Sequence, residues 1–256
     1  MGKRLNWECV SAAVIGTSHV ERGGVCQDRA SARLYQQGAR PWLALFVADG
    51  AGSASHGEYG AQMAIEVATA CVERMMNLPE VSLGDQLAVE TITAIRAEIY
   101  ATAEQAGCTA RDYACTFIAL LSSDLGTLVF QIGDGGVVLD VGEGLELAIQ
   151  PMNGEYANMT HFVTDEDALD HLESRSYGGI VLRAAAFSDG VQRLAIDMAT
   201  GTPHPPFFAP FFTVLGTVTP GKRDQLPRAL EAFLASEKVN ERTDDDKSMA
   251  LALLRG

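Results

Sequence analysis

The sequence lacks a long apolar segment and lacks paired-cysteine motifs. No stretch approaches the ~18 consecutive apolar residues that a membrane-spanning helix needs. No apolar segment follows Lys3 and Arg4 as it would in a secretory signal. The five cysteines are odd in number and scattered, without a C-x-x-C pair. This pattern is typical of free thiols in a reducing compartment, and it argues against a disulfide framework or a cysteine zinc site. We therefore expect a cytoplasmic protein.

Positive charge is also scarce. The chain has 19 Lys and Arg against 33 Asp and Glu, which gives a formal net charge of −14. Nucleic acid and anionic membrane surfaces would repel such a protein, so neither is expected as a partner. Hydrophobic residues make up 47% of the 256 residues, enough for a sizeable core. We expect one domain that spans residues 1–256, and a monomer.

Short apolar runs bounded by Gly and Asp predict buried strands. They are Trp7–Ile15, Trp42–Ala48, Cys115–Leu121, Thr127–Ile132, Val137–Val141, Ile180–Phe187 and Met249–Leu254. Apolar residues at a 3.6-residue period predict helices at Glu58–Met76, Leu83–Ala106 and Leu226–Leu234. Strands follow strands and helices follow helices, which favours an α+β layered fold over an alternating parallel sheet.

One local pattern occurs three times: an apolar run that ends in Asp-Gly. The acidic residues are Asp49, Asp134 and Asp189, and the cluster Asp244–Asp246 stands just before the last predicted strand. Each Asp-Gly alone is most simply a turn. If the strand ends converge, the carboxylates repel one another, and a divalent cation such as Mg²⁺ or Mn²⁺ removes that cost.

Other catalytic templates do not fit. The sequence has no phosphate-binding G-x-x-x-x-G-K-[ST] loop, no H-E-x-x-H metal motif and no G-x-S-x-G nucleophile motif. Acidic strand ends therefore remain the main candidate for chemistry.

Several short motifs occur in an order that resembles a known family. They are Gly24–Asp28, Val47–Gly52, Gly57–Glu58, Ile132–Gly135, Phe187–Val191 and Asp245–Ser248. This order is similar to that of the metal-dependent serine/threonine protein phosphatases of type 2C, in their compact bacterial branch. The resemblance covers roughly residues 10–254. It implies a four-layer α-β-β-α sandwich, with two packed antiparallel sheets flanked by helices.

The resemblance also implies a centre of two Mn²⁺ or Mg²⁺ ions at one edge of the sandwich. Asp49 would bridge the two ions, and the Gly50 carbonyl would bind one of them. Asp189 and Asp245 would hold the other ion, and a one-residue slip in the alignment would exchange Asp245 for Asp246. Asp28 would support the first ion through water. Asp134 would face either a weaker third ion or an ordered water.

The chain departs from the family pattern at several positions. Some members have a His after the bridging Asp-Gly, where this chain has Ala51. Many have a phosphate-binding Arg before the Gln27-Asp28 position, and many have a Glu where this chain has Gln27. His19 and His56 are the remaining candidates for phosphate contact or for a catalytic acid. Each also has a plain alternative, a structural hydrogen bond for His19 and a loop position for His56.

The predicted activity is hydrolysis of phosphoserine or phosphothreonine in proteins by a metal-activated water, without a phosphoenzyme. The implied partners are a phosphorylated protein substrate and a cognate serine/threonine kinase. Three alternatives remain: a catalytically silent binding or sensor domain of the same fold, a phosphatase of a small metabolite, and a carboxylate-metal nuclease. The intact set of aspartates speaks against the first, and the net charge of −14 disfavours the last.

Two further segments have two interpretations each. The Phe- and Pro-rich segment 203–212 is either a docking surface or, more simply, a loop anchored on the core by its aromatic rings. Residues 153–158 lie where the family often has a flap near the active site. They are either a substrate-selecting loop or a solvated one.

Overall fold

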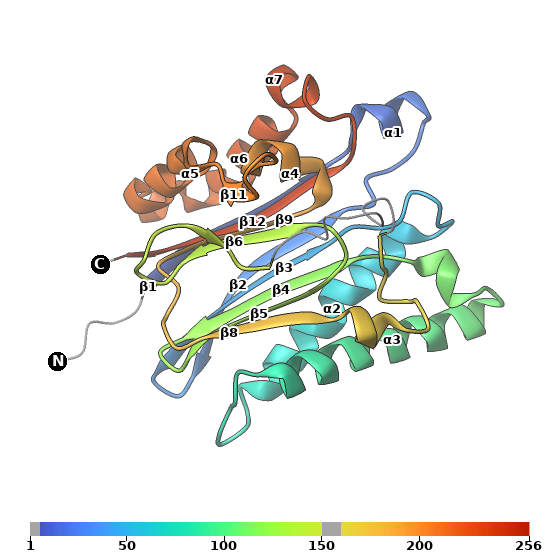
Figure 1. Cartoon of the computed structure of the whole chain (residues 1–256), viewed down its shortest axis with the longest axis horizontal. Helices are drawn as coiled ribbons and strands as arrows, with labels where there is room; N and C mark the ends of the chain where they lie inside the picture. Colours follow the sequence, from blue (N-terminus) through green and yellow to red (C-terminus); the bar gives the residue numbers. More distant parts are fainter. Residues whose placement is uncertain (1–5, 150–159, 256) are drawn as a thin grey trace.

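The computed structural model of the chain describes residues 6–149 and 160–255. Two five-stranded sheets pack face to face, with helices on both outer sides (Figure 1). All strand pairs in both sheets are antiparallel. This is the four-layer arrangement expected from the sequence. Within the described residues, no helix is long and apolar enough to cross a membrane.

The first sheet has the order β1-β12-β9-β6-β7 and the second has the order β2-β3-β4-β5-β8. The first is formed by β1 (Asn6–Val14), β12 (Lys247–Arg255), β9 (Arg183–Phe187), β6 (Gly136–Asp140) and β7 (Glu146–Leu147). The second is formed by β2 (Arg29–Gln37), β3 (Arg40–Ala48), β4 (Phe117–Ser123), β5 (Gly126–Ile132) and β8 (Glu173–Tyr177). A separate small ribbon pairs β10 (Ile196–Asp197) with β11 (Thr202–Pro203).

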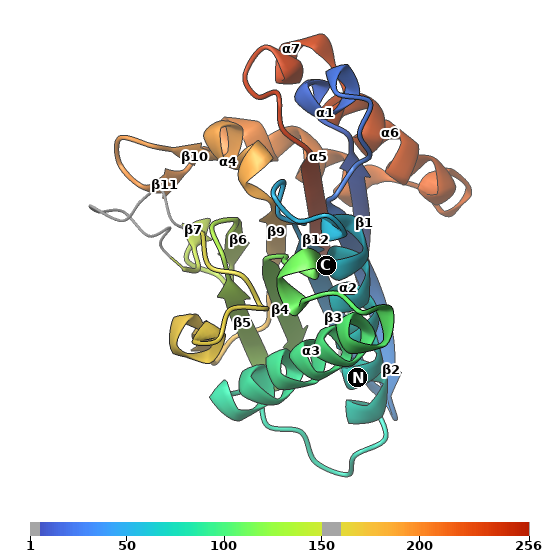
Figure 2. The same ribbon diagram turned by 90° about the vertical axis from the view of Figure 1, so that its right-hand side faces the viewer.

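Helices cover the outer face of each sheet. The second sheet carries α2 (Gly57–Met75) and α3 (Asp85–Ala106), and the first carries α4 (Asp189–Ala195), α5 (Pro205–Thr217) and α6 (Leu226–Leu234). Two short helices, α1 (Thr17–Glu21) and α7 (Glu237–Asn240), lie side by side at one end of the molecule (Figures 1 and 2). Short 3₁₀ turns are η1 (Ala110–Tyr113), η2 (Ala168–His171) and η3 (Pro220–Gln225).

The sandwich explains why the central strands are apolar along their whole length. Side chains alternate between the two faces of a strand. In β3, Trp42, Ala44 and Phe46 face the core under α2 and α3, whereas Leu43 and Leu45 face the opposite sheet. Both faces are buried, so the strand becomes a continuous apolar run instead of an alternating one.

The predicted strands do not include β2 and β8, nor the two-residue strands β7, β10 and β11. The first two are the longer ones. Both lie at an edge of the second sheet and are only partly buried. Edge strands tolerate polar and charged residues, so neither forms the apolar run by which the other strands were found.

The Phe- and Pro-rich segment is a core anchor, but it forms a helix and not a loop. Most of it lies in α5, which begins at Pro205, a favoured residue at the first position of a helix. Phe208 and Phe212 are buried against the first sheet. Residues 153–158, the predicted flap, lie outside the described residues.

Candidate active site

A cavity of about 390 Å³ lies where several acidic strand ends meet. Its wall includes Gly50 and five acidic residues: Asp49, Asp134, Asp189, Asp244 and Asp245. They come from the end of β3, the β5–β6 turn, the start of α4 and the segment before β12. Antiparallel strands bring both starts and ends to one edge, which is how residues far apart in sequence come together here.

Hydrogen bonds to Thr116 and close packing against Gly57 hold the chain directly after β3 in place. The Asp49 amide donates to Thr116 Oγ1 at 3.1 Å, and the Thr116 amide donates to the Asp49 carbonyl at 2.8 Å. The next residue must be glycine, because a Cβ on Gly50 would overlap the backbone of Gly57. These contacts fix the backbone of Asp49 and Gly50, and both residues line the cavity.

Asp28 lies behind this wall and is completely buried. Its Oδ2 accepts a hydrogen bond of 2.6 Å from the Ser188 hydroxyl, and its Oδ1 has no hydrogen-bond partner. Ser188 in turn accepts a bond of 3.0 Å from the Ser248 amide. Ser188 therefore links three strand ends. The sequence analysis missed it because it read only the acidic residue of the Ser188-Asp189-Gly190 motif.

Asp189 and Asp134 are positioned by their neighbours. Asp189 begins α4, and a Cβ on the following Gly190 would overlap the Asp246 carbonyl, so only glycine allows this close approach. Asp134 accepts a bond of 2.7 Å from the Thr160 hydroxyl, and its carbonyl accepts one of 2.9 Å from Gln192. Thr160 also lines the cavity.

The carboxylates raise one another's pKa values. Burial raises the pKa of Asp49 well above its usual range, and the charges of Asp28 and Asp189 raise it further. Burial is also the main reason that the pKa of Asp28 rises to about 7. The pKa of Asp189 rises to about 6 through burial and the charges of Asp134 and Asp245. Such a site is electrostatically unfavourable without a cation.

The two adjacent candidates in the acidic cluster have different surroundings. Asp245 is exposed and lines the cavity. Asp246 is 2% exposed and does not line it. Its carboxylate accepts bonds of 2.6 Å from the Gly16 and Gln27 amides and lies 3.0 Å from His19 Nδ1. Asp246 therefore ties two loops to the start of β12, and its oxygens already have partners.

Only one of the two histidine candidates, His19, lies at the cavity. His19, on α1, lines the cavity and is oriented by Asp246. His56 precedes α2, does not line the cavity, and has its ring centroid 5.1 Å from that of Tyr113. Arg22 does line the cavity, although the sequence analysis found no phosphate-binding Arg. Its position three residues after His19, one helical turn on, was the signal for it.

The donor set fits divalent cations that prefer oxygen. Asp28 Oδ1 and Asp189 Oδ1 are both buried, and neither has a hydrogen-bond partner among the described residues. Unpaired buried carboxylate oxygens are costly unless a cation or water satisfies them. Carboxylates with one backbone carbonyl are the ligands that suit Mg²⁺ and Mn²⁺.

Comparisons with known proteins show which family this chain matches. Residues 15–235 match the model of a family described as protein phosphatase 2C. The chain is 48% identical over 250 residues to serine/threonine-protein phosphatase 3 of Escherichia coli (strain K12), covering 97% of this chain and 99% of that protein.

Solved structures share the fold at low sequence identity. Serine/threonine phosphatase Stp1 from Staphylococcus aureus has a TM-score of 0.63 at 14% identity, covering 100% of this chain and 97% of that chain. The S. agalactiae serine/threonine phosphatase has a TM-score of 0.64 at 15% identity, covering 97% and 99% of the two chains.

Proposed function

This chain belongs to the protein phosphatase 2C family, and we propose that its acidic cavity is the site at which it hydrolyses phosphoserine and phosphothreonine in proteins. The family match and the 48% identical relative make it a serine/threonine protein phosphatase. Metal dependence is general to this family. The observation that carries the assignment to this cavity is the convergence of acidic strand ends with unpaired buried oxygens.

In the proposed site, each acidic residue has a distinct role. Asp49 and the Gly50 carbonyl would hold one divalent ion. Asp189 and Asp245 would hold a second ion, and Asp49 would bind this ion as well. Asp28 would support the first ion through water, and Asp134 would face a weaker third ion or an ordered water. Two bound Mn²⁺ or Mg²⁺ ions supply a water of lowered pKa and positive charge beside the phosphoryl oxygens. Asp246 is left out of the ligand set because it is already bonded to two backbone amides.

Two basic side chains on the cavity wall, Arg22 and His19, would orient the phosphate. Arg22 and, when protonated, His19 offer N–H donors to the phosphoryl oxygens. His19 Nδ1 lies 3.0 Å from Asp246 Oδ2, so the ring would present its other nitrogen to the substrate or to the leaving oxygen. His56 has no such position and is left out of the substrate site.

A phosphoprotein substrate follows from the enzyme class, and we also propose a cognate serine/threonine kinase. We further propose a monomer, a single domain over residues 1–256 and a cytoplasmic location. The shared core between the two sheets supports a single domain. The five free cysteines support a reducing compartment.

The test compares Asp49→Asn with the wild type on para-nitrophenyl phosphate and a phosphothreonine peptide, with and without Mn²⁺. We expect Mn²⁺-dependent turnover of both substrates by the wild type. We expect a loss of about two to three orders of magnitude in the variant, with an unchanged circular dichroism spectrum. Full activity of Asp49→Asn at defined metal content would overturn the proposed centre. Activity on metabolites but never on phosphopeptides would favour a metabolite phosphatase.

A further inference from the structure

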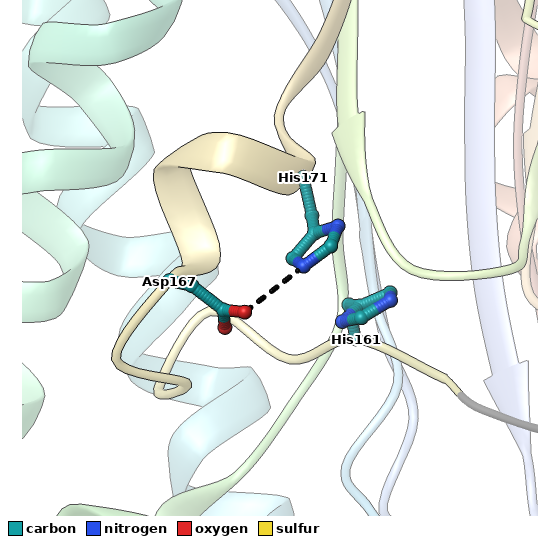
Figure 3. A group of neighbouring side chains, drawn as sticks. All are labelled: His161, Asp167 and His171. Atoms are coloured by element: carbon teal, nitrogen blue, oxygen red, sulfur yellow. Dashed lines mark hydrogen bonds and ion pairs between the residues drawn. The ribbon is translucent and has the colours of Figure 1, made fainter.

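Three side chains that commonly bind metals meet outside the active-site cavity. They are His161, Asp167 and His171, on the segment that leads into η2 and through it. One ring nitrogen of each histidine and a carboxylate oxygen of Asp167 all lie within 4.8 Å of one another. Figure 3 shows the two imidazole rings and the carboxylate turned toward a common space.

The two imidazole rings stack closely on each other. Their centroids are 3.4 Å apart and their planes differ by 16°. A neutral imidazole offers one ring nitrogen with a lone pair as a metal ligand. His171 Nε2 lies 3.2 Å from Asp167 Oδ2, which adds a negative charge beside the rings.

The backbone that carries these residues is fixed from outside the cluster. From α3, Arg96 donates to the carbonyls of Val163 and Asp165, and Tyr100 donates to the carbonyl of Thr164 at 2.9 Å. His171 Nε2 lies 3.2 Å from Asp167 Oδ2, so the two side chains lie on the same side of η2. The site is therefore held in place before any ligand binds.

An ion has a route to this cluster from solvent. The side chains of His161 and His171 are 19% and 26% exposed, and that of Asp167 is 60% exposed. An ion bound at ~2.0–2.2 Å from each ligand atom needs those atoms within about 4.4 Å of one another. Closing the present spacing requires these side chains to rotate, and the two stacked rings must tilt so that their in-plane lone pairs converge on one ion.

We propose that His161, Asp167 and His171 bind one transition-metal ion of the zinc class, with water completing its coordination. Two imidazoles and one carboxylate suit Zn²⁺, Co²⁺ or Ni²⁺, whereas the all-oxygen set at the cavity suits Mg²⁺ or Mn²⁺. The two sites therefore differ in the metals that they select.

An ion in this site would also stiffen one side of the active-site cavity. Thr160, directly before His161, lines the cavity and bonds to Asp134 at 2.7 Å. Fixing His161 would restrict the backbone at Thr160 and so hold Asp134 in place. The role is structural, and it involves no step of the reaction.

The alternative is that these histidines form ion pairs only. His171 pairs with Asp167, and His161 Nδ1 lies 4.0 Å from Asp165. Asp165 already accepts a bond of 2.8 Å from the Phe162 amide, so it is a weaker partner for His161. Metal counting separates the two explanations.

The experiment measures Zn²⁺ binding by chelator-treated protein in excess Mg²⁺. Zinc bound per chain is determined after desalting, for the wild type, His171→Gln and Asp167→Asn. The matched control is His204→Gln, which removes an exposed histidine elsewhere on the surface. We expect the wild type and the control to bind one more Zn²⁺ than His171→Gln. We expect Asp167→Asn to bind that ion about tenfold more weakly.

Nitrogen chemical shifts of the imidazoles, measured during the same titration, identify the ligands. We expect the ring nitrogens of His161 and His171 to shift on addition of Zn²⁺, and those of His204 to stay unchanged. Equal zinc content in all four proteins, or unchanged shifts at His161 and His171, would overturn the proposal. If His171→Gln does not fold, the exposed Asp167→Asn variant and the shifts decide the question alone.

Discussion

Ser188 is the residue on which several contacts of the active-site edge depend. Its buried hydroxyl donates to Asp28 at 2.6 Å and accepts from the Ser248 amide at 3.0 Å. No water can replace these bonds without a rearrangement, because the residue is 1% exposed. A buried donor that loses its partner costs more than an ordinary hydrogen bond contributes.

We predict that Ser188→Ala lowers the free energy of unfolding by about 1–3 kcal/mol, measured by urea denaturation. The matched control is Ser174→Ala, whose hydroxyl bonds to Asp85 at an exposed position and whose loss should cost less than ~0.5 kcal/mol. Equal losses of unfolding free energy in the two variants would mean that the buried hydrogen bond stabilises the protein no more than the exposed one.

Two neighbouring residues in the segment before β12 have different surroundings. Asp245 faces the cavity, whereas Asp246 bonds to the backbone of two loops. Strand alternation does not predict this split, because both residues precede β12, which begins at Lys247.

Replacing each of the two residues by asparagine should therefore give opposite phenotypes. Asp246→Asn should destabilise the metal-free protein by about 2 kcal/mol or more, since it weakens two bonds to a charged acceptor. Asp245→Asn should change stability by less than ~0.5 kcal/mol but raise the Mn²⁺ concentration for half-maximal activity about tenfold or more. Urea denaturation and Mn²⁺ titration of activity give the two readouts. The reverse pattern would make Asp246 the ligand.

Helix α5 contributes to the core through its aromatic residues. Phe208 is completely buried, with its ring centroid 6.2 Å from that of Phe187 in β9. β9 leads directly to Ser188 and Asp189, so packing of α5 supports the active-site edge from behind.

We predict that Phe208→Ala lowers the free energy of unfolding by about 3–5 kcal/mol. The control on the same helix is Val214→Ala, a residue that is 49% exposed, which should cost less than ~1 kcal/mol. Denaturation curves for both variants test this. A small effect of Phe208→Ala would remove the case for α5 as a core element.

At the scale of the whole molecule, the acidic edge makes stability depend on metal and pH together. The pKa values of Asp28 and Asp189 are about 7 and about 6, against 3.8 for an ordinary aspartate. The metal-free folded state therefore holds protons between pH ~4 and ~7 that the unfolded chain has released. Stability must fall as the pH rises through that window.

We predict that the melting temperature of chelator-treated protein falls from pH 5 to pH 8, measured by differential scanning fluorimetry. In Mn²⁺ the trend should reverse, since metal binding requires deprotonated carboxylates. The slope without metal should shrink in Asp28→Asn, which removes one of the raised groups. A metal-free melting temperature that rises over this range would contradict the raised pKa values.

The amino-acid sequence by itself determined the layered α+β class, most of the buried strands and the acidic residues that end them. Apolar periodicity records burial directly, and Asp-Gly after an apolar run marks a strand end wherever it occurs. Edge strands β2 and β8 escaped because their burial is one-sided, so they have no apolar run.

Only the tertiary structure decided which of these residues lie together. It put Asp245 at the cavity and Asp246 behind it, moved His56 away, and brought in Arg22, Thr160 and Ser188. It also brought His161 to His171, although neither lies in a motif. The physical reason is that spacing along a chain fixes local geometry, whereas convergence across two sheets depends on how their faces pack.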